Sequence, residues 1–524
     1  MKVALRTDAS ERIGTGHLMR CLTLADALRS GGARTRFVCR PLPAGLAELV
    51  TGRGHELAAL PPGDGAAGGG AVGGGAAIGA AGEPEAGSVS DPPHAARLGA
   101  SQADDAQATL AALAGEAAWD WLVVDHYALD ARWESRLRGC ARRILAIDDL
   151  ADRRHDCDAL LDQNLHADMQ ARYARRVPAH CVQLLGPRYA LLRPEFGEAR
   201  ARLRERGEAV GRVLVFFGGI DAANLTASAL DALDALGLDA DVDVVIGAAH
   251  PRRAALEARS TARPRTALHV QATDMAALIA AADVGIGAAG VATWERCALG
   301  LPSLAFAVAA NQQELLRDAA REGLVLGPQV DPSDPAALAL QLRALLENPA
   351  LRAHLARRGL ESVDAQGASR VARALLQPEV VVRPATRADA RDLFEWRNAP
   401  EVRRFSRSDA AIGWDDHCRW LAAVLDDPQR ALLVGSAGAS PAGVVRFDID
   451  GVEAEVSIYL APGQAGRGMG RALLDAAERW LAAHRAGVSL LGAEALARND
   501  ASHRLFTGCG FEAFSTRYRK RIDR

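Results

Sequence analysis

The sequence lacks the features that carry a chain into or through a membrane. Its first residues run straight into the apolar segment Val3-Ala4-Leu5, without the charged region and long apolar stretch of a secretory signal. No apolar run is long enough to span a bilayer. We therefore expect a cytoplasmic protein without membrane insertion.

The sequence also has few cysteines and no excess of positive charge. The eight cysteines are scattered and form no CxxC pair, which argues against a disulfide framework and against a zinc site. We interpret them as reduced thiols, and no metal is expected. The formal net charge of −3 provides no basic field of the kind that nucleic-acid binding needs. Nucleic acid is therefore not an expected partner.

The remaining composition is that of a globular protein, with 49% hydrophobic and 24% charged residues. The 524 residues suffice for about three domains. Their patterns predict a Rossmann-like domain at 1–195, a second at 196–376 and an α+β domain at 380–524. Within the first domain, residues 61–103 are rich in glycine and alanine. Such a segment buries too little apolar area to offset its ordering entropy, so we expect a flexible surface insertion.

A histidine stands in the first glycine loop of the chain. The strand at Val3-Ala4-Leu5 precedes a polar loop with Gly16 and His17, and a helix over 18–28 follows. Ligands of open α/β domains lie at the carboxyl ends of the strands, so His17 is predicted to face substrate. Alternatively, it caps the helix or binds a carbonyl. Because Met19 stands where a dinucleotide fingerprint has its third glycine, NAD is not implied.

Further polar residues follow the strand at 121–124. This strand ends at Asp125-His126-Tyr127, and a carboxylate and a phenol at that position are predicted to point into the ligand cleft. Capping of the loop by Asp125 is an equally good interpretation.

The second half contains a predicted nucleotide site. Its first strand, at 213–217, leads into Gly218-Gly219, and a later glycine-rich strand enters a helix over 291–299. Small residues let backbone approach a ligand, and Gly290 with Thr293 at the helix start is predicted to hold phosphate. Glu295 is predicted to accept hydrogen bonds from ribose hydroxyls. Asn311 follows the next strand. Alternatively, the glycines serve only packing of helix against strand. Two Rossmann-like halves around one cleft form the GT-B fold.

The third domain opens with a strand at 380–383 and helices over 388–397 and 414–425. Short turns predict antiparallel strands at 431–434, 442–448 and 453–460. The last strand runs into a glycine loop at 461–470 and a helix from Arg471. Successive N–H groups of such a loop can bind a diphosphate.

Residues 1–375 resemble the UDP-sugar hydrolases of pseudaminic acid biosynthesis. The motifs that carry the resemblance are Arg6-x-Asp8-Ala9-Ser10, Gly14-x-Gly16-His17-x-x-Arg20-Cys21-Leu22, Trp133-Glu134, Ile147-Asp148-Asp149, Asp162-Gln163-Asn164, Phe217-Gly218-Gly219-x-Asp221 and Thr293-Trp294-Glu295-Arg296. The family removes UDP from UDP-2,4-diacetamido-2,4,6-trideoxy-β-L-altropyranose with inversion at C1 and without an obligatory metal. The resemblance implies that His17 is the base that activates water. The implied substrate- and UDP-binding residues are Arg6, Asp8, Gly16, Tyr127, Arg193, Gly219, Gly290, Thr293, Glu295 and Asn311.

Residues 380–514 resemble the GNAT acetyltransferases, and within them the enzyme that acetylates the 4-amino group of a UDP-amino sugar one step earlier in that pathway. Acetyl-CoA is therefore the implied cosubstrate. The residues expected to bind it are Gly466, Arg467, Gly468, Met469, Gly470, Asn499 and Ser502. Ala465 departs from the loop pattern, and Phe506 replaces the tyrosine that often acts as general acid. That acid is thus unassigned, with Tyr459 or a water as candidates, or the domain is slow or inactive.

Together the two resemblances predict a bifunctional enzyme of α/β class, with a GT-B fold and a C-terminal α+β GNAT domain. Its expected partners are a UDP-linked diamino-trideoxy sugar and acetyl-CoA. Two alternatives stay open: a GT-B glycosyltransferase that uses a UDP-sugar, and a binding or scaffolding protein in which one or both sites are dead. The sequence predicts neither the exact sugar isomer nor the oligomeric state.

Overall fold

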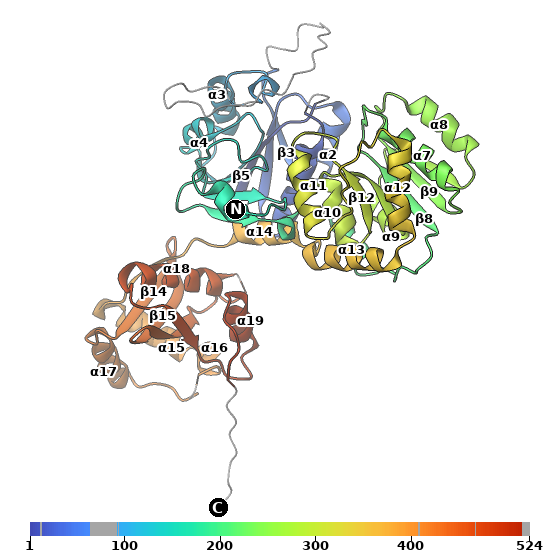
Figure 1. Ribbon diagram of the computed structural model, residues 1–524. Helices are drawn as coiled ribbons and strands as arrows, with labels where there is room; N and C mark the ends of the chain where they lie inside the picture. Colours follow the sequence, from blue (N-terminus) through green and yellow to red (C-terminus); the bar gives the residue numbers. More distant parts are fainter. Residues whose placement is uncertain (11–12, 63–91, 93, 407–408, 467, 516–524) are drawn as a thin grey trace, which may run out of the picture. The chain divides into compact units, whose positions relative to one another are not determined.

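The computed structural model describes residues 1–10, 13–62, 92, 94–406, 409–466 and 468–515. The chain forms two compact units, Met1–Leu376 and Gln377–Arg524 (Figure 1). Among the described residues, no helix is both long and apolar enough to cross a membrane.

The first unit begins with a seven-stranded parallel sheet in the order β3-β2-β1-β4-β5-β6-β7. Its central strands are largely buried on both faces, as expected for a parallel sheet covered by helices, whereas the strands at its two edges are partly exposed. In chain order they are β1 (Lys2–Thr7), β2 (Arg34–Cys39), β3 (Glu56–Ala59), β4 (Trp119–Asp125), β5 (Ala141–Ile147), β6 (Ala159–Asp162) and β7 (Val182–Leu185). The helices between them are α1 (Gly16–Ser30), α2 (Ala44–Gly52), α3 (Gln102–Leu113), α4 (Ala131–Leu137) and α5 (Met169–Tyr173), with short 3₁₀ helices η1 (Ala95–Arg97) and η2 (Pro187–Tyr189).

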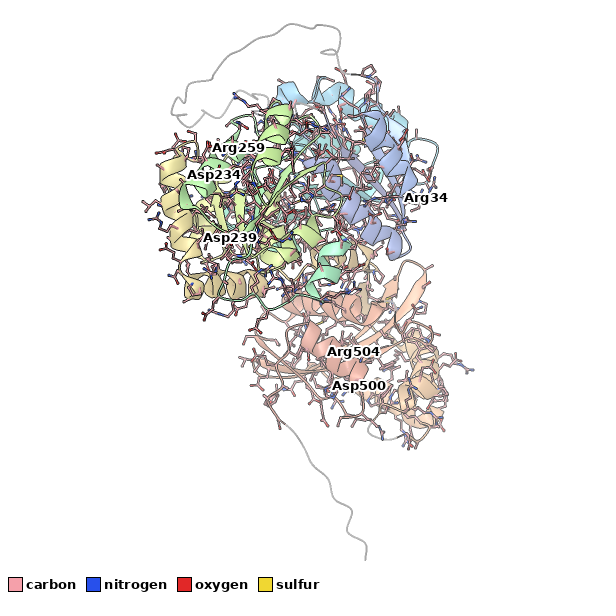
Figure 2. All side chains as sticks on the ribbon, turned by 90° about the vertical axis from the view of Figure 1, so that its right-hand side faces the viewer. Arg34, Asp234, Asp239, Arg259, Asp500 and Arg504 are labelled. Atoms are coloured by element: carbon pink, nitrogen blue, oxygen red, sulfur yellow. The ribbon has the colours of Figure 1, made fainter. Side chains whose placement is uncertain are left out.

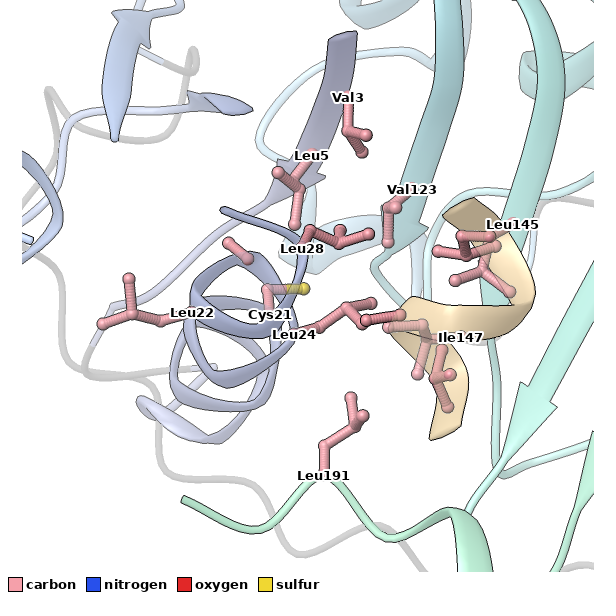
Figure 3. Close-up of a cluster of buried hydrophobic side chains, with 14 of the residues drawn as sticks. Val3, Leu5, Cys21, Leu22, Leu24, Leu28, Val123, Leu145, Ile147 and Leu191 are labelled. Carbon is pink, nitrogen blue, oxygen red and sulfur yellow. The ribbon is translucent and has the colours of Figure 1, made fainter. Parts of the chain in front are cut away.

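Helix α1 is anchored by its apolar face. Figure 3 shows Cys21 and Leu24 of α1 among the side chains of Leu5 and Val123 from the central strands. All four of these residues are fully buried. This packing fixes the start of α1 beside the ends of β1 and β4, where the predicted histidine lies.

A second parallel sheet follows in the same unit, in the order β10-β9-β8-β11-β12. Its strands are β8 (Arg212–Phe216), β9 (Asp241–Ile246), β10 (Thr266–Val270), β11 (Val284–Ala288) and β12 (Ser303–Phe306). Its helices are α6 (Pro194–Arg200), α7 (Leu225–Leu236), α8 (Arg253–Ala262), α9 (Met275–Ala281), α10 (Val291–Ala298), α11 (Gln312–Arg321), α12 (Pro335–Leu346) and α13 (Pro349–Ser362). Two such sheets with flanking helices confirm the predicted GT-B fold.

The surface of this second half carries exposed ion pairs, some of whose residues are labelled in Figure 2. Arg259 of α8 donates to Asp234 of α7 at 2.9 Å, with the aspartate side chain 49% exposed. Such surface pairs each contribute at most about 1 kcal/mol, so the apolar cores, rather than these pairs, hold the helices in place.

The last helix of the first unit, α14 (Gly367–Leu376), returns to the first sheet. Its Val371 and Leu375 are 0% and 1% exposed and belong to the same core as α1. We expected the helical pattern to fade here and assigned the segment to the second half by chain order. That expectation was wrong, because the apolar side chains of α14 are buried against the first sheet.

The edges of the expected insertion at 61–103 are also part of the fold. Residues 63–91 and 93, which make up most of it, lie outside the described residues. After them, Leu98 is 1% exposed in the core beneath β4 and β5. Ser101 caps α3 by accepting a hydrogen bond from the Asp104 N–H at 3.1 Å. The fold therefore includes η1, Leu98 and Ser101, which we had assigned to the insertion.

The second unit is built on a five-stranded sheet in the order β13-β14-β15-β16-β17. Its first four strands pair antiparallel, as predicted, and β17 joins β16 in parallel. The strands are β13 (Val381–Pro384), β14 (Arg430–Ala437), β15 (Ser440–Asp450), β16 (Glu453–Leu460) and β17 (Leu490–Ala493). The helices are η3 (Arg387–Asp389), α15 (Ala390–Asn398), α16 (Pro400–Arg403), α17 (Trp414–Leu425), α18 (Met469–His484) and α19 (Asp500–Gly508).

Candidate active sites

His17 is the second residue of α1 and lies near the carboxyl edge of the first sheet. β1 and β4 are neighbours in register, so that Thr7 pairs with Asp125. The His17 Nδ1 is 2.6 Å from Asp125 Oδ1. The His17 residue is 9% exposed, whereas Asp125 is fully buried. The two side chains therefore form a buried histidine–carboxylate pair.

Arg20, one turn later in α1, holds the same carboxylate. Its Nε and Nη2 each donate to one Asp125 oxygen at 2.6 Å, and its Nη1 donates to Asp149 at 3.1 Å. Burial would raise the pKa of Asp125, but the charges of Arg20 and His17 hold that pKa well below its usual range. An ionised Asp125 can accept only from a protonated Nδ1, and in that tautomer of a neutral imidazole the Nε2 carries no proton.

Aromatic rings surround the imidazole. The Tyr127 ring meets that of His17 edge-on at 4.5 Å between centroids, and His94 lies 5.5 Å from Tyr127. Burial and the Asp149 carboxylate raise the pKa of Tyr127, so its hydroxyl keeps its proton at neutral pH. The structure thus brings the predicted Tyr127 to His17.

Arg6 and Asp8 lie in a buried network behind this pair. Arg6 is 0% exposed and donates to Asp8 at 2.8 Å and to Asp105 at 2.7 Å. Asp8 also accepts from the Arg40 N–H at 2.8 Å. Gly16, in contrast, is exposed at the start of α1. Arg6 and Asp8 are therefore placed to support the strand end, and Gly16 is placed at the surface.

Two glycines of the second half lie where neighbouring backbone leaves no room for a side chain. A Cβ on Gly287 would lie 2.0 Å from the Phe216 carbonyl oxygen, and one on Gly247 would lie 2.5 Å from that of Gly219. The Gly247 N–H also donates to the Gly219 oxygen at 2.9 Å. Close packing against β8 and the residues after it therefore accounts for Gly287 and Gly247, rather than the packing of helix against strand that our alternative interpretation named. Gly219 itself is exposed beyond β8.

The helix that follows, α10, carries the predicted phosphate residues. Gly290 is its N-cap residue, in extended backbone conformation, and the Gln312 side-chain nitrogen lies next to it. Thr293 is 0% exposed, and its hydroxyl oxygen is 3.4 Å from Arg296 Nη2, which donates to it. The hydroxyl of Thr293 is thus engaged inside the protein, and its N–H donates to the Gly290 carbonyl at 2.9 Å. Phosphate binding at the start of α10 stays a prediction.

Glu295 and Arg193 are brought together across the two halves. Arg193, just before α6, has its Nη2 3.8 Å from Glu295 Oε1. Burial raises the pKa of Glu295, and Arg193 opposes that rise. Asn311 is exposed at the N-cap of α11. Whether these residues and His17 face one cleft stays a prediction.

Three residues beside these sites were not assigned by sequence reasoning: Arg20, His94 and Gln312. Asp125 was predicted to point into the cleft, with a capping role as its alternative, but not to pair with His17, and Arg20 appeared only within a motif. The signal that identifies both is the register of β1 against β4, which places the end of β4 beside the start of α1. His94 was hidden inside the expected insertion, so no local pattern pointed to it.

The glycine loop of the second unit has the backbone that its residues predict. Gly466 and Gly468 have φ of 77° and 73°, a left-handed conformation that glycine adopts without strain. Gly470 lies in the first turn of α18, and the Met469 side chain is 5% exposed in the core. Met469 can therefore offer only its backbone to a ligand. Arg467 lies outside the described residues.

The downstream motif has a structural role at the start of α19. Asn499 caps this helix by accepting the Ser502 N–H at 3.1 Å. Phe506 is 9% exposed and packs on Phe511, with 5.1 Å between ring centroids. Phe506 is thus a core residue in this unit.

A pocket of about 230 Å³ opens between α15, α17 and the sheet of the second unit. Its lining residues are Arg397, Ile412, His417, Trp420, Leu432, Val444, Arg446, Ser457 and Tyr459. Burial raises the pKa of Tyr459 although Arg397 and Arg446 oppose the rise. Within the described residues, the buried Arg397 Nη1 has no hydrogen-bond partner. The pocket therefore combines an apolar wall with a protonated phenol and a buried cation.

Residues 379–512 match the family model of the acetyltransferase (GNAT) domain. The chain is 30% identical over 195 residues to the spore coat polysaccharide biosynthesis protein SpsG of Bacillus subtilis, covering 37% of this chain and 57% of that protein. It is 26% identical over 227 residues to the UDP-2,4-diacetamido-2,4,6-trideoxy-beta-L-altropyranose hydrolase of Campylobacter jejuni, covering 43% of this chain and 63% of the hydrolase. Both matches span less than two thirds of the relative's length.

Among solved structures, MurG of Acinetobacter baumannii aligns over 72% of this chain and 99% of its own, with 15% identity and a TM-score of 0.48. Spermidine N-acetyltransferase of Vibrio cholerae aligns over 26% of this chain and 83% of its own, with 19% identity and a TM-score of 0.25. By sequence, the chain joins a part homologous to the Campylobacter hydrolase to a C-terminal GNAT domain.

Proposed function

We propose that the first unit hydrolyses UDP-2,4-diacetamido-2,4,6-trideoxy-β-L-altropyranose to the free sugar and UDP. The second unit would acetylate the 4-amino group of the UDP-amino sugar that precedes it, with acetyl-CoA as donor. Similarity to the Campylobacter hydrolase and the GNAT match support the pairing of these two activities. The observation that carries the hydrolase proposal is the His17–Asp125 pair, held by Arg20 at the start of α1.

In the proposed hydrolysis, His17 is the base for water. Asp125 accepts Nδ1–H, so Nε2 takes a proton from water as the water oxygen bonds to the anomeric carbon. The bond from C1 to the diphosphate oxygen breaks, its electron pair leaves with UDP, and the configuration at C1 inverts. The imidazolium that forms is stabilised by the ionised Asp125. The phenol of Tyr127 adjoins this site and can donate a hydrogen bond to the sugar.

The leaving diphosphate is proposed to lie at the start of α10. N–H groups after Gly290 and the helix dipole would stabilise the charge that develops on it. Arg193 supplies a cation near Glu295, and Glu295 is proposed to accept from the ribose hydroxyls. Gly219 and Asn311 complete the proposed nucleotide site from the neighbouring strand ends.

In the proposed acetyl transfer, N–H groups of the 466–470 loop bind the diphosphate of acetyl-CoA. The sugar amine attacks the thioester carbonyl and forms the amide C–N bond, and the C–S bond breaks. The CoA thiolate takes a proton from the general acid, and the proton that the amide nitrogen loses passes to water, from which the acid is reprotonated. Phe506 has no proton to give. Tyr459 keeps its proton because burial raises its pKa, and we assign it as the general acid. The acceptor sugar would enter the pocket that Arg397 and Tyr459 line.

Release of UDP in buffer alone tests the hydrolase assignment. The purified full chain should release UDP from the diacetamido UDP-sugar without any added acceptor, and His17→Ala should abolish the release. A strict glycosyltransferase would release UDP only when an acceptor is added, and a dead site would release none. Full activity of His17→Ala would refute the proposed mechanism.

A further inference from the structure

A polar pocket of about 460 Å³ lies between the two halves of the first unit. His166, on the loop between β6 and α5, comes from the first half, whereas Glu314 and Asp318 lie on α11 of the second. One possible ligand atom from each of these three side chains lies within 4.8 Å of the other two. The fold thus gathers one imidazole and two carboxylates from segments far apart in the sequence.

His166 is buried without a hydrogen-bond partner. The residue is 6% exposed, and neither ring nitrogen has a hydrogen-bond partner among the described residues. The nearest acceptors are too distant for a hydrogen bond, with Asp162 Oδ2 at 3.6 Å from Nε2 and Glu314 Oε2 at 3.7 Å from Nδ1. An unsatisfied buried polar group lowers the stability of the folded protein by about 1–3 kcal/mol. A ligand bound between the imidazole and the carboxylates would remove this cost.

We propose that His166, Glu314 and Asp318 bind a divalent cation of the zinc class. One imidazole nitrogen and two carboxylate oxygens suit Zn²⁺, and a water would complete four-coordination. Asp318 is 5% exposed, and its Oδ2 accepts the Ala167 N–H at 3.1 Å, which fixes the carboxylate. Its Oδ1 lies 3.7 Å from Arg317 and 3.9 Å from Arg321, beyond hydrogen-bond distance, and is the oxygen that would bind the ion. Our expectation of no metal rested on the cysteine pattern and on the metal-free hydrolysis that the resemblance implies, and the proposed cation would be a departure from it at a different set of ligands.

Arg172 competes with the cation for one ligand. Its Nη1 donates to Glu314 Oε2 at 2.7 Å. Its Nη2 also donates to the carbonyl oxygens of Asp149 and Leu150, both at 3.1 Å, so Arg172 keeps partners when Glu314 turns away. The Glu314 side chain is 47% exposed, and its Oε1 lies 3.8 Å from Arg317 Nη2. Removal of the Arg172 charge is therefore expected to strengthen cation binding.

A cation held in this way would link the two halves of the unit. It binds the folded arrangement, in which the loop after β6 meets α11, so it raises the free energy of unfolding of the first unit by RT ln(1 + c/Kd), where c is the free cation concentration. This inference does not depend on the proposed hydrolysis, because binding and stability are measured without substrate.

The test uses the full chain, stripped with EDTA and then titrated with ZnCl₂. We expect one bound Zn²⁺ per chain by calorimetry and a rise in melting temperature of several degrees. His166→Gln should abolish both, and Arg172→Gln should bind Zn²⁺ several-fold more tightly than wild type. Co²⁺ in place of Zn²⁺ should give a visible absorption band that His166→Gln lacks.

Two controls keep the test specific. His180→Gln changes an exposed histidine outside the site and should leave Zn²⁺ binding unchanged. Cys181 Sγ lies 3.6 Å from Cys157 Sγ, and two neighbouring thiols are also potential zinc ligands. The substitution Cys181→Ser removes one of them and should also leave Zn²⁺ binding unchanged. Circular dichroism confirms that each variant is folded. Absence of Zn²⁺ binding, or binding that survives His166→Gln or disappears in Cys181→Ser, would overturn the proposal.

Discussion

At the scale of single residues, sequence reasoning found the histidine but not the groups that control it. His17 stands in a recognisable glycine loop, so a local pattern sufficed to single it out. Asp125 and Arg20 act on it across neighbouring strands, and an aspartate after a strand is as typical of a loop cap. Thr293 shows the converse, because its place at a helix start suggested a phosphate ligand while its hydroxyl is buried.

Substitution Asp125→Asn tests the role of the buried carboxylate. The amide keeps the size of the side chain but removes the charge that selects the Nδ1–H tautomer of His17. We expect kcat for UDP release to fall by about 10²–10⁴, with little change in KM. Steady-state kinetics measure both, and Asp231→Asn, at an exposed site, is the matched control. A kcat near that of wild type would contradict the pairing.

Substitution Tyr459→Phe tests the acid of the second unit. Loss of the phenol should lower kcat for acetyl transfer by about 10²–10⁴, because the CoA thiolate then takes its proton from water. Binding of CoA, measured by calorimetry, should stay as in wild type, since the glycine loop is untouched. An unchanged kcat would show that water or another group is the acid.

At the scale of elements, apolar periodicity predicted most strands and helices close to their bounds, as at α17, predicted over 414–425 and found at Trp414–Leu425. It failed at α14, because no local pattern tells which of two sheets a helix will cover. The edge of the glycine-rich segment was misplaced for a similar reason. The composition predicted a flexible insertion up to residue 103, whereas Leu98 is buried in the core.

The position of α14 predicts the effect of a cavity. Leu375 is 1% exposed in the core of the first sheet, so Leu375→Ala should lower the free energy of unfolding by about 2–5 kcal/mol. Urea denaturation measures the change. The matched control is Leu340→Ala, at a leucine that is 65% exposed and should cost less than about 1 kcal/mol. Equal effects of the two substitutions would argue against the packing of α14 on the first sheet.

At the scale of the whole molecule, the chain couples two units with different chemistry. A fused acetyltransferase and hydrolase would raise the local concentration of their shared intermediate when the linkage lets both sites reach it. Such coupling cannot be derived from the sequence, since neither the junction at Gln377 nor the composition reports on the path between the sites. The stability of the molecule, in contrast, depends on buried charges that the structure shows.

His155 predicts how that stability changes with pH. Burial lowers its pKa, but Glu134, at 2.8 Å from Nδ1, and Asp148 raise it to about 9. The pKa in the unfolded chain is about 6.5, so the stabilisation is complete below pH 6.5 and is lost as pH rises through about 9. A shift of this size corresponds to about 3 kcal/mol.

Calorimetric unfolding between pH 6 and pH 10 is the measurement for this prediction. The melting temperature of wild type should fall across that window, and the fall should be smaller in His155→Gln, because Asp162, whose burial raises its pKa to about 8, still contributes to it. Identical pH profiles for the two proteins would contradict the role given to His155.

The most direct test of the central claim is hydrolysis of the diacetamido UDP-sugar in H₂¹⁸O. The account predicts that the purified chain releases UDP without an acceptor, that the label appears in the free sugar at C1 with inverted configuration, and that His17→Ala loses both. Release of UDP carrying the label in its phosphate, or release only in the presence of an acceptor, would contradict water attack at the anomeric carbon directed by His17.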